Sequence, residues 1–525
     1  MNVDKFLAHH GIVENPFGAE EARHDPVFER LISQSAHNHP DFAKILGQIE
    51  HPSTSVVFGE KGSGKTAIRL QIDSRVAEHN RNHPEKRVLL AAYDDLNPVI
   101  DLILQSTRPD NTRLRMRRTK GDLTGIIRLE DHQDAILSLA TTQLINGLLD
   151  EDSDAEPRRR MMMPGDLTRR LKRMPREDRR MLAVLAALYD QPRAGTGEGR
   201  WRKVLKRLRL RRSIGLWVMK WTASVFAVLA VGAAIGWLGA SKWLDPQPTY
   251  IKYAPTFAGV LAVIAAILGV MLLRQRMHVW SLARRIAREL HAIDRQPQQL
   301  RRMLGAFTAS ELAEHPMPHR RDDDDQSRYE LTARLVDLLE SFDYVGLLVL
   351  VDRVDEPTVI SGNPQKMRDF IWPVFDSKFL QQDRVGLKLL LPVELRHMLH
   401  RESAEFFQEA RLDKQNLIDR LTWSGATLYD LCTERLRACQ RDGADPVYLT
   451  DLFDADASRD VIVDSLDQMH QPRDAFKFLY QVIQEHCRMV PDDQAKFTIP
   501  RPVLDTVRKM QSQRVQELYR GLSPS

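Results

Sequence analysis

Hydrophobic positions along the chain fall into four short continuous runs and two much longer ones. Short runs of Val, Leu and Ile are typical of strands that are buried on both faces of a parallel sheet. Around them, apolar residues recur at helical spacing. The pattern predicts an α/β fold, in which helices flank a parallel sheet with strands at Ser55–Phe58, Arg87–Asp94, Val345–Asp352 and Val385–Pro392.

The two long runs, Trp221–Ser241 and Tyr253–Leu273, each hold 21 residues without a charge. At about 1.5 Å per residue, each is long enough to cross a hydrocarbon core of about 30 Å. Only Lys242–Lys252 separates them, so we predict a transmembrane hairpin. Small residues at four-residue spacing are expected to let its helices pack closely: Gly232, Gly236 and Ala240.

The charged flanks predict how this hairpin is oriented. A basic run, Arg200–Arg212, precedes the first span, and four arginines follow the second, whereas the connection has few charges. Basic flanks stay on the cytoplasmic side. We therefore expect a multi-pass protein of the cytoplasmic membrane with both terminal regions cytoplasmic, and anionic lipid headgroups as partners of the flanks. Nucleic acid is the alternative partner of the basic run.

The first predicted strand leads into a loop that fits the phosphate-binding pattern G-x-x-x-x-G-K-[ST] at every fixed position. We expect its glycines to adopt conformations closed to other residues, so that backbone N–H groups surround a phosphate. Lys65 would bind the β- and γ-phosphates and Thr66 would bind Mg²⁺. The predicted cofactors are ATP and Mg²⁺, and the predicted binding residues are Gly59, Glu60, Lys61, Gly62, Ser63, Gly64, Lys65 and Thr66.

A second element of such sites is an aspartate that ends an apolar strand and orders the magnesium shell. Asp352 is the candidate for this metal site. Many ATPases place a glutamate directly after it to polarise water, but Arg353 occupies that position. Asp355 and Glu356 are the candidate catalytic residues instead. Nucleotide binding is therefore a firmer prediction than fast hydrolysis.

Composition shifts divide the chain into seven segments. The C-terminal segment includes predicted helices at Leu428–Cys439 and from Gln471 onward, and Arg473 either binds the nucleotide or is a surface residue. The segments are a helical lead-in (1–52), the first part of the core (53–120), a helical insert with the basic run (121–213), the hairpin (214–273), a juxtamembrane helix at His278–Phe307 with an acidic linker (274–340), the second part of the core (341–410) and a C-terminal helical lid (411–525).

Composition adds only broad limits. The chain has 525 residues, of which 43% are hydrophobic and 28% are charged, as in a globular protein with a small membrane insert. The net charge of +5 argues only weakly for nucleic acid. Three cysteines form neither a disulfide framework nor a zinc pattern, which suits a reducing cytoplasm.

Together, the phosphate loop, the hairpin before the Asp-bearing strand and the late Pro472-Arg473-Asp474 helix resemble the KAP-type P-loop NTPases, relatives of the STAND and AAA+ ATPases. Asn15-Pro16-Phe17, Leu421–Leu436 and Gln471–Leu479 are also similar to origin-recognition-like bacterial AAA+ ATPases. The family usually has two adjacent acidic residues where this chain has Asp352-Arg353.

This resemblance implies a cytoplasmic ATPase core with a helical lid, anchored in the bacterial inner membrane. Its nucleotide state would be coupled to assembly or signalling, through a homo-oligomer or a protein partner. KAP-like proteins are implicated in membrane-associated signalling and in bacterial defence against phage, and no residue of this chain selects between these two roles. By the same analogy, Lys65, Thr66 and Asp352 would bind Mg²⁺ and ATP, and Arg473 would sense the nucleotide.

Three functions follow from these patterns. The first is a membrane-anchored ATPase that drives a conformational or assembly switch. The second, suggested by Arg353, is a nucleotide-binding membrane scaffold with little turnover. The third is a membrane-tethered AAA+ ATPase that handles DNA or RNA, suggested by the basic helices.

Overall fold

The computed structural model describes most of the chain. Several sequence-based predictions lie outside the described residues: Arg211 and Arg212 of the basic run, part of the connection within the hairpin, and the acidic cluster Asp322–Asp325. The described residues are 1–19, 21–33, 39–106, 123, 125–151, 157–192, 197–210, 214–243, 249–318 and 326–519.

A five-stranded sheet forms the centre of the fold, in the order β2-β3-β4-β1-β5, and every neighbouring pair is parallel. This confirms the predicted α/β class. Four strands coincide with the predicted runs to within one residue at either end. The fifth, β5, was not predicted and lies beyond residue 410, where the predicted core ended. The strands are β1 (Ser55–Gly59), β2 (Arg87–Tyr93), β3 (Tyr344–Val351), β4 (Val385–Pro392) and β5 (Asn416–Ile418).

Alternating side chains of these strands build a separate core on each face of the sheet. Val57, Leu90, Leu350 and Leu390 pack with α3 (Phe42–Leu46) and α4 (Lys65–Asn82). Residues of the opposite parity pack on the other face with the helices α7 (Leu129–Leu149), α15 (Gln326–Glu340), α16 (Pro364–Ile371) and α18 (Val393–Leu399).

The chain between β2 and β3 forms the helical insert and the hairpin. Its predicted helix over Asp166–Tyr189 is two helices, because Pro175 disfavours a helical conformation at the residue before it. Outside the hairpin, the described insert contains α5 (Asn97–Ser106), α7, η2 (Pro157–Arg159), α8 (Leu167–Arg173), α9 (Arg176–Tyr189), α10 (Gly197–Arg207), α13 (Pro297–Leu304), α14 (Ala309–Ala313) and α15.

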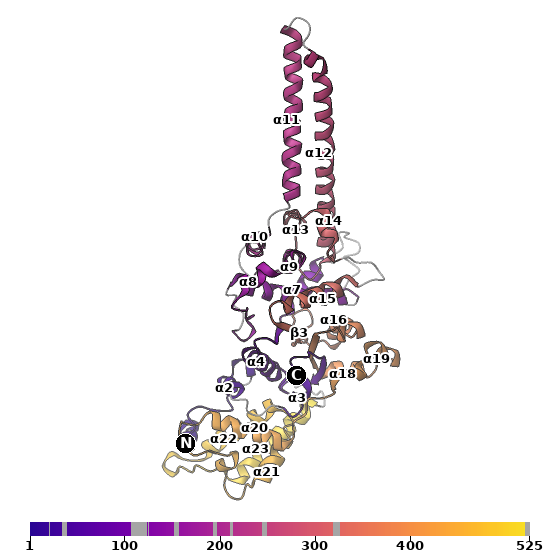
Figure 1. Cartoon of the computed structure of the whole chain (residues 1–525). Coiled ribbons are helices and arrows are strands. Elements are labelled where there is room, and N and C mark those ends of the chain that lie inside the picture. The colour runs from indigo at the N-terminus through magenta and orange to yellow at the C-terminus, as the bar shows by residue number, and fades with distance from the viewer. Residues whose placement is uncertain are drawn as a thin grey trace.

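Two long apolar helices, α11 (Ile214–Trp243) and α12 (Thr249–Glu289), pack along each other and project from the body (Figure 1). Both are long and apolar enough to cross a membrane, and only 6% and 11% of their most apolar windows are buried. The predicted separate helix at His278–Phe307 is wrong. Instead, α12 continues to Glu289, because its last turns bury apolar side chains against the body: Val279, Ala283 and Ile286.

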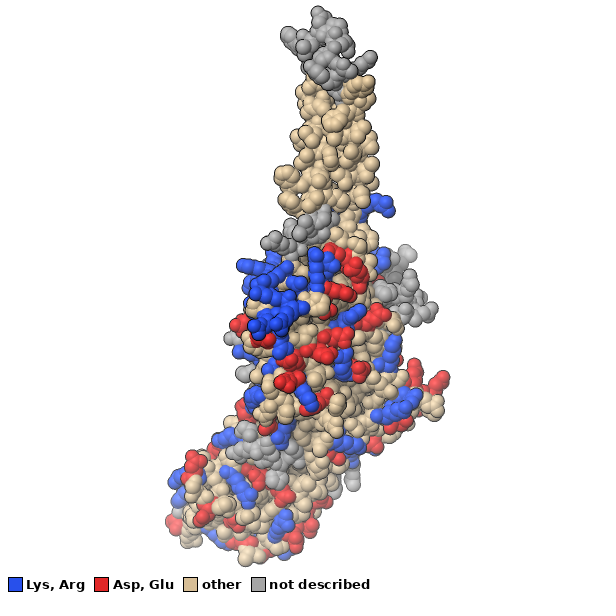
Figure 2. Space-filling view, in the orientation of Figure 1, with Lys and Arg blue, Asp and Glu red and all other residues tan. Residues whose placement is uncertain are grey.

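The predicted packing role is also wrong for Gly232 and Gly236, whereas the side chain of Ala240 lies outside the described residues. A Cβ atom added at Gly232 or Gly236 would have no heavy atom within 4 Å. These glycines therefore face open space. The hairpin's buried positions lie elsewhere, because α11 packs on α12 through another face that includes Ala230. Figure 2 shows the hairpin as a nearly uncharged surface, with lysines and arginines gathered on the body near its base.

The C-terminal helices and the N-terminal lead-in share a third core at the end of the molecule opposite the hairpin (Figure 1). The lead-in contains α1 (Val3–His9), η1 (Ala22–His24), α2 (Pro26–Ser33) and α3. The lid contains α20 (Gly425–Ala438), η5 (Leu449–Leu452), α21 (Arg459–Asp467), α22 (Pro472–Met489), η6 (Asp492–Gln494) and α23 (Arg501–Tyr519). Short elements after β3 complete the fold: η3 (Trp372–Val374), α17 (Ser377–Leu380), α19 (Ala404–Ala410) and η4 (Leu412–Lys414).

Candidate functional site

The loop between β1 and α4 has the shape that its glycines were predicted to permit, with one difference. Gly62 and Gly64 have φ values of 103° and 97°, a region that strongly favours glycine. Gly59 has no such φ. It is needed for space, because a Cβ atom there would lie 2.5 Å from Ser63 Oγ. The reason predicted for Gly59 was therefore wrong.

Lys65 and Thr66 open α4 and line a cavity of about 280 Å³. Lys65 Nζ donates hydrogen bonds to the carbonyl oxygens of Gly59, at 2.7 Å, and Glu60, at 2.9 Å. Burial lowers the pKa of Lys65, and the nearby Asp352 carboxylate opposes this shift. The amino end of α4 also directs its positive dipole into the cavity.

Asp352 follows β3 directly and lines the same cavity, although β4 separates β3 from β1 in the sheet. The residue is 2% exposed. Burial raises the pKa of its carboxyl group, and Arg69 opposes this effect. Among the described residues, Asp352 Oδ2 has no hydrogen-bond partner. A buried carboxylate oxygen left in this way fits a divalent cation as a ligand.

The two predicted catalytic carboxylates line the cavity as well, but they differ in their surroundings. Arg353 has a φ of 62°, so the chain turns sharply after Asp352. Arg353 Nη1 lies 3.6 Å from Glu356 Oε2, and the Glu356 side chain is 58% exposed. Asp355 is half-buried, and its charge raises the pKa of Lys65. Asp355 is therefore the better placed of the two.

A third carboxylate, Glu394, was not predicted as a site residue. It lies in the first turn of α18, immediately after β4, and its charge also raises the pKa of Lys65. It lines a neighbouring cleft together with Glu60 and Lys61. The sequence did contain a signal, because Glu394 lies two residues after the end of the predicted strand Val385–Pro392.

The lid contacts the Gly59–Thr66 loop directly. Arg473 is the second residue of α22 and lines the cavity, and a Cβ atom added at Gly62 would lie 3.1 Å from Arg473 Cβ. Of the two alternatives for Arg473, its placement beside the loop favours the binding role. Trp423 Nε1 donates to the Ser63 carbonyl oxygen at 2.8 Å. The Glu60 side chain accepts from two lid-side residues, Arg420 and Gln471.

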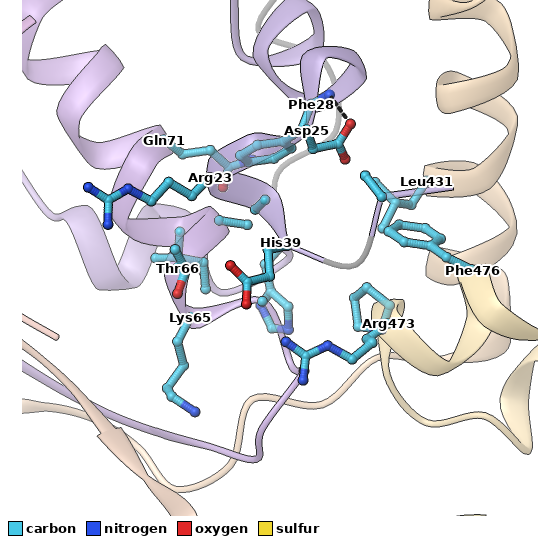
Figure 3. A pocket seen from close by; sticks show the side chains of 18 of the residues that line it. Arg23, Asp25, Phe28, His39, Lys65, Thr66, Gln71, Leu431, Arg473 and Phe476 are labelled. Atoms are coloured by element: carbon cyan, nitrogen blue, oxygen red, sulfur yellow. Dashed lines mark hydrogen bonds between the residues drawn. The ribbon is translucent and has the colours of Figure 1, made fainter. Parts of the chain in front are cut away.

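The lead-in forms an unpredicted wall of the cavity. In Figure 3, Arg23 and Phe28 lie across the cavity from the lid residues Leu431 and Phe476. His39 instead contacts the lid segment directly, through the Thr422 carbonyl oxygen at 2.9 Å. Arg435 joins the lead-in to the lid: it pairs with the buried Asp25 at 2.7 Å and donates to the Pro16 carbonyl oxygen at 2.7 Å. In the sequence, the Asn15-Pro16-Phe17 segment supported only a family resemblance, and this contact was not predicted.

Within the described part of the chain, no cluster of three or more His, Cys, Asp or Glu residues is arranged to hold a metal ion. A magnesium ion bound together with nucleotide phosphates needs only one or two protein ligands. Thr66 and Asp352, which line one cavity, fit that smaller requirement.

No protein-family model, curated protein or solved structure matches the chain. The parallel sheet and its strand order are consistent with a P-loop-like fold. No family is identified, so membership of the KAP-type NTPases stays a prediction.

Proposed function

We propose that the protein is a membrane-anchored ATPase that couples binding and hydrolysis of Mg²⁺-ATP to a conformational or assembly switch. One observation carries this proposal. Lys65, Thr66 and Asp352 come from segments nearly 300 residues apart, yet they line a single cavity beside Arg473 of the lid.

Each residue has a role that its position supports. The N–H groups of the loop and the amino end of α4 would hold the phosphates. Lys65 would exchange its hydrogen bonds to the Gly59 and Glu60 carbonyl oxygens for contacts with these phosphates. A bound Mg²⁺ would neutralise phosphate charge. Thr66 and Asp352 would hold this ion, and Asp355 or Glu394 would accept a proton from the attacking water.

The lid supports coupling to a larger movement. Arg473 and Trp423 both lie against the loop, so phosphates bound there would meet the lid directly. Arginine binds phosphate strongly through a planar array of donors. Nucleotide would therefore draw the lid onto the core, and its loss would release the lid. A second copy of the chain or another protein would bind one of these two lid positions in preference to the other.

The hairpin supports anchoring in a bacterial inner membrane. Its helices are apolar and almost fully exposed, and α10 at its foot carries the exposed side chains of Lys206 and Arg207. Anionic headgroups would bind these basic residues.

The second candidate is a nucleotide-binding scaffold with little turnover. The observation that favours it is the pairing of Arg353 with Glu356, because an arginine occupies the usual position of the water-polarising glutamate.

The test is phosphate release by the full chain in detergent with ATP and Mg²⁺. We expect turnover by the wild type, almost none by Asp352→Asn, and a loss of about 10²–10⁴-fold for whichever of Asp355→Asn and Glu394→Gln removes the base. Glu356→Gln should lose less. Glu405→Gln, an exposed position on α19, is the control.

Binding of ATP without any phosphate release would favour the scaffold. Turnover that requires added DNA or RNA would favour the nucleic-acid-handling alternative instead. Turnover by Asp352→Asn equal to the wild type would contradict the proposed metal site.

A further inference from the structure

Arg69 lies directly behind the candidate metal carboxylate. It follows Thr66 by one turn of α4, and its side chain is 2% exposed. Its guanidinium group lies between two carboxylates, each of which follows a strand. Nη1 donates to Asp94, which follows β2, and Nε lies 3.7 Å from Oδ2 of Asp352, which follows β3.

A second arginine extends this cluster into the helical insert. Arg159, in η2, donates to Asp73 of α4 through Nε, at 3.2 Å, and Nη2, at 2.6 Å. Its Nη1 also lies 3.7 Å from Asp94 Oδ2. Asp94 is therefore shared between Arg69 and Arg159. The chain from Arg159 continues through the insert to the hairpin.

The contact between Arg69 and Asp352 is electrostatic and lacks a hydrogen bond. Among the described residues, neither Arg69 Nε nor Asp352 Oδ2 has a hydrogen-bond partner. A buried ion pair that only stabilised the fold would be expected to form such bonds, because they offset the cost of desolvation. This pair leaves the buried Oδ2 of Asp352 without a hydrogen bond and keeps a positive charge 3.7 Å from it.

We propose that Arg69 is a positioning residue that acts as the resident counter-cation of Asp352 when no metal is bound, and that Asp94 and Arg159 set how strongly Arg69 is drawn to Asp352. This inference rests on the proposed nucleotide function. A divalent cation on Asp352 repels the guanidinium group toward Asp94. Asp94 then interacts more with Arg69 and less with Arg159. Binding of the metal at Asp352 therefore changes a contact of the helical insert.

The cluster has a thermodynamic consequence with a definite sign. Without metal, an uncompensated Asp352 carboxylate repels the phosphates of ATP, and Arg69 reduces this repulsion. When metal is bound, the metal cation itself reduces the repulsion between Asp352 and the phosphates. Removing Arg69 must therefore weaken metal-free ATP binding more than Mg²⁺-ATP binding. The ratio of the two dissociation constants measures this coupling between metal and nucleotide.

The experiment measures ATP affinity of the full chain in detergent, with Mg²⁺ and with excess chelator. We expect Arg69→Gln to raise the ratio of metal-free Kd to Mg²⁺ Kd by about tenfold or more. Asp94→Asn should lower it, because Arg69 then moves closer to Asp352. Arg159→Gln should raise it less than Arg69→Gln, because Asp94 then draws Arg69 away.

Arg69→Lys keeps the charge and should keep the ratio near that of the wild type, which a purely structural role would not predict. The matched controls are Arg75→Gln on the same helix and Arg158→Gln beside Arg159, which pair with Glu78 and Glu29. If Arg69→Gln fails to fold, the lowered ratio of Asp94→Asn is still required.

Two failures are distinguishable. If the wild type binds ATP but Arg69→Gln and Asp94→Asn both leave the ratio unchanged, the counter-cation role is overturned and the proposed function stands. If the wild type binds no ATP with Mg²⁺, the proposed function itself fails.

Discussion

Lys388 is the least expected charged residue of the sheet. It lies in the middle of β4, is fully buried, and its register partner on β1 is Ser55. Its neighbour Leu390 places this side of β4 on the face that α3 and α4 cover. Among the described residues, Lys388 Nζ has no hydrogen-bond partner, and burial lowers the pKa of the amine to about 7.

This pKa makes the stability of the fold depend on pH. The unfolded chain binds a proton at Lys388 up to pH 10.5 and the folded chain only up to about 7. Between these values the unfolded state holds more protons, so the free energy of unfolding rises with pH. We predict that Lys388→Met raises the thermal midpoint at pH 7 and flattens its rise toward pH 10.

Lys388→Met should raise the free energy of unfolding at pH 7 by at most about 5 kcal/mol, since each pKa unit corresponds to about 1.4 kcal/mol. Thermal unfolding in detergent from pH 6.5 to 10 measures it, with Lys172→Met, an exposed lysine of α8, as the control. An unchanged or lowered midpoint for Lys388→Met at pH 7 would show that the buried amine has a partner and stabilises the fold.

Single residues also show where sequence reasoning ends. Lys65, Thr66 and Asp352 could be predicted, because each belongs to a pattern of neighbours in the sequence. Arg69 and Trp423 could not, because nothing beside them in the chain marks them. Their importance arises only when β3, β4 and the lid come together around the loop.

Among the elements, mainly apolar runs of four to eight residues predicted the four longer strands well. The strand β5 has only three residues, which is too few to form such a run. The end of α12 was misplaced for a different reason. The change after Leu273 from exposed apolar residues to residues that pack against the body alters the composition without breaking the helix.

The hairpin leads to a prediction about topology. Residues in the connection between α11 and α12 should face away from the cytoplasm, and α10 should face toward it. A membrane-impermeant maleimide should therefore label Gln247→Cys in intact spheroplasts, and Lys206→Cys only after permeabilisation. Labelling of Lys206→Cys in intact spheroplasts would contradict this topology. Recovery of the protein in the soluble fraction would contradict the membrane anchor.

The native cysteines should give little background in this assay. All three are buried, and burial raises the thiol pKa of Cys432 to about 12 and that of Cys439 to about 11. The thiolate is the reactive form, and these shifts keep it scarce. The chain without added cysteines is the control.

At the scale of the whole molecule, the candidate site lies between two structures that could move. The insert and its hairpin lie on one side of the sheet, and the lid and lead-in lie at the opposite end (Figure 1). Arg159 reaches toward the site from the insert, and Arg473 reaches it from the lid. A ligand in the cavity would contact the lid directly and affect the insert through Arg69 and Asp94.

The central claim is that this cavity binds Mg²⁺-ATP through Lys65. The most direct measurement is equilibrium binding of labelled ATP with Mg²⁺ to the full chain in detergent, for the wild type, Lys65→Ala and the surface control Lys172→Ala. We predict saturable binding of one ATP per chain by the wild type and the control, and affinity reduced at least about tenfold in Lys65→Ala, which loses a charged phosphate contact. No binding by the wild type, or equal binding by Lys65→Ala, would contradict the account.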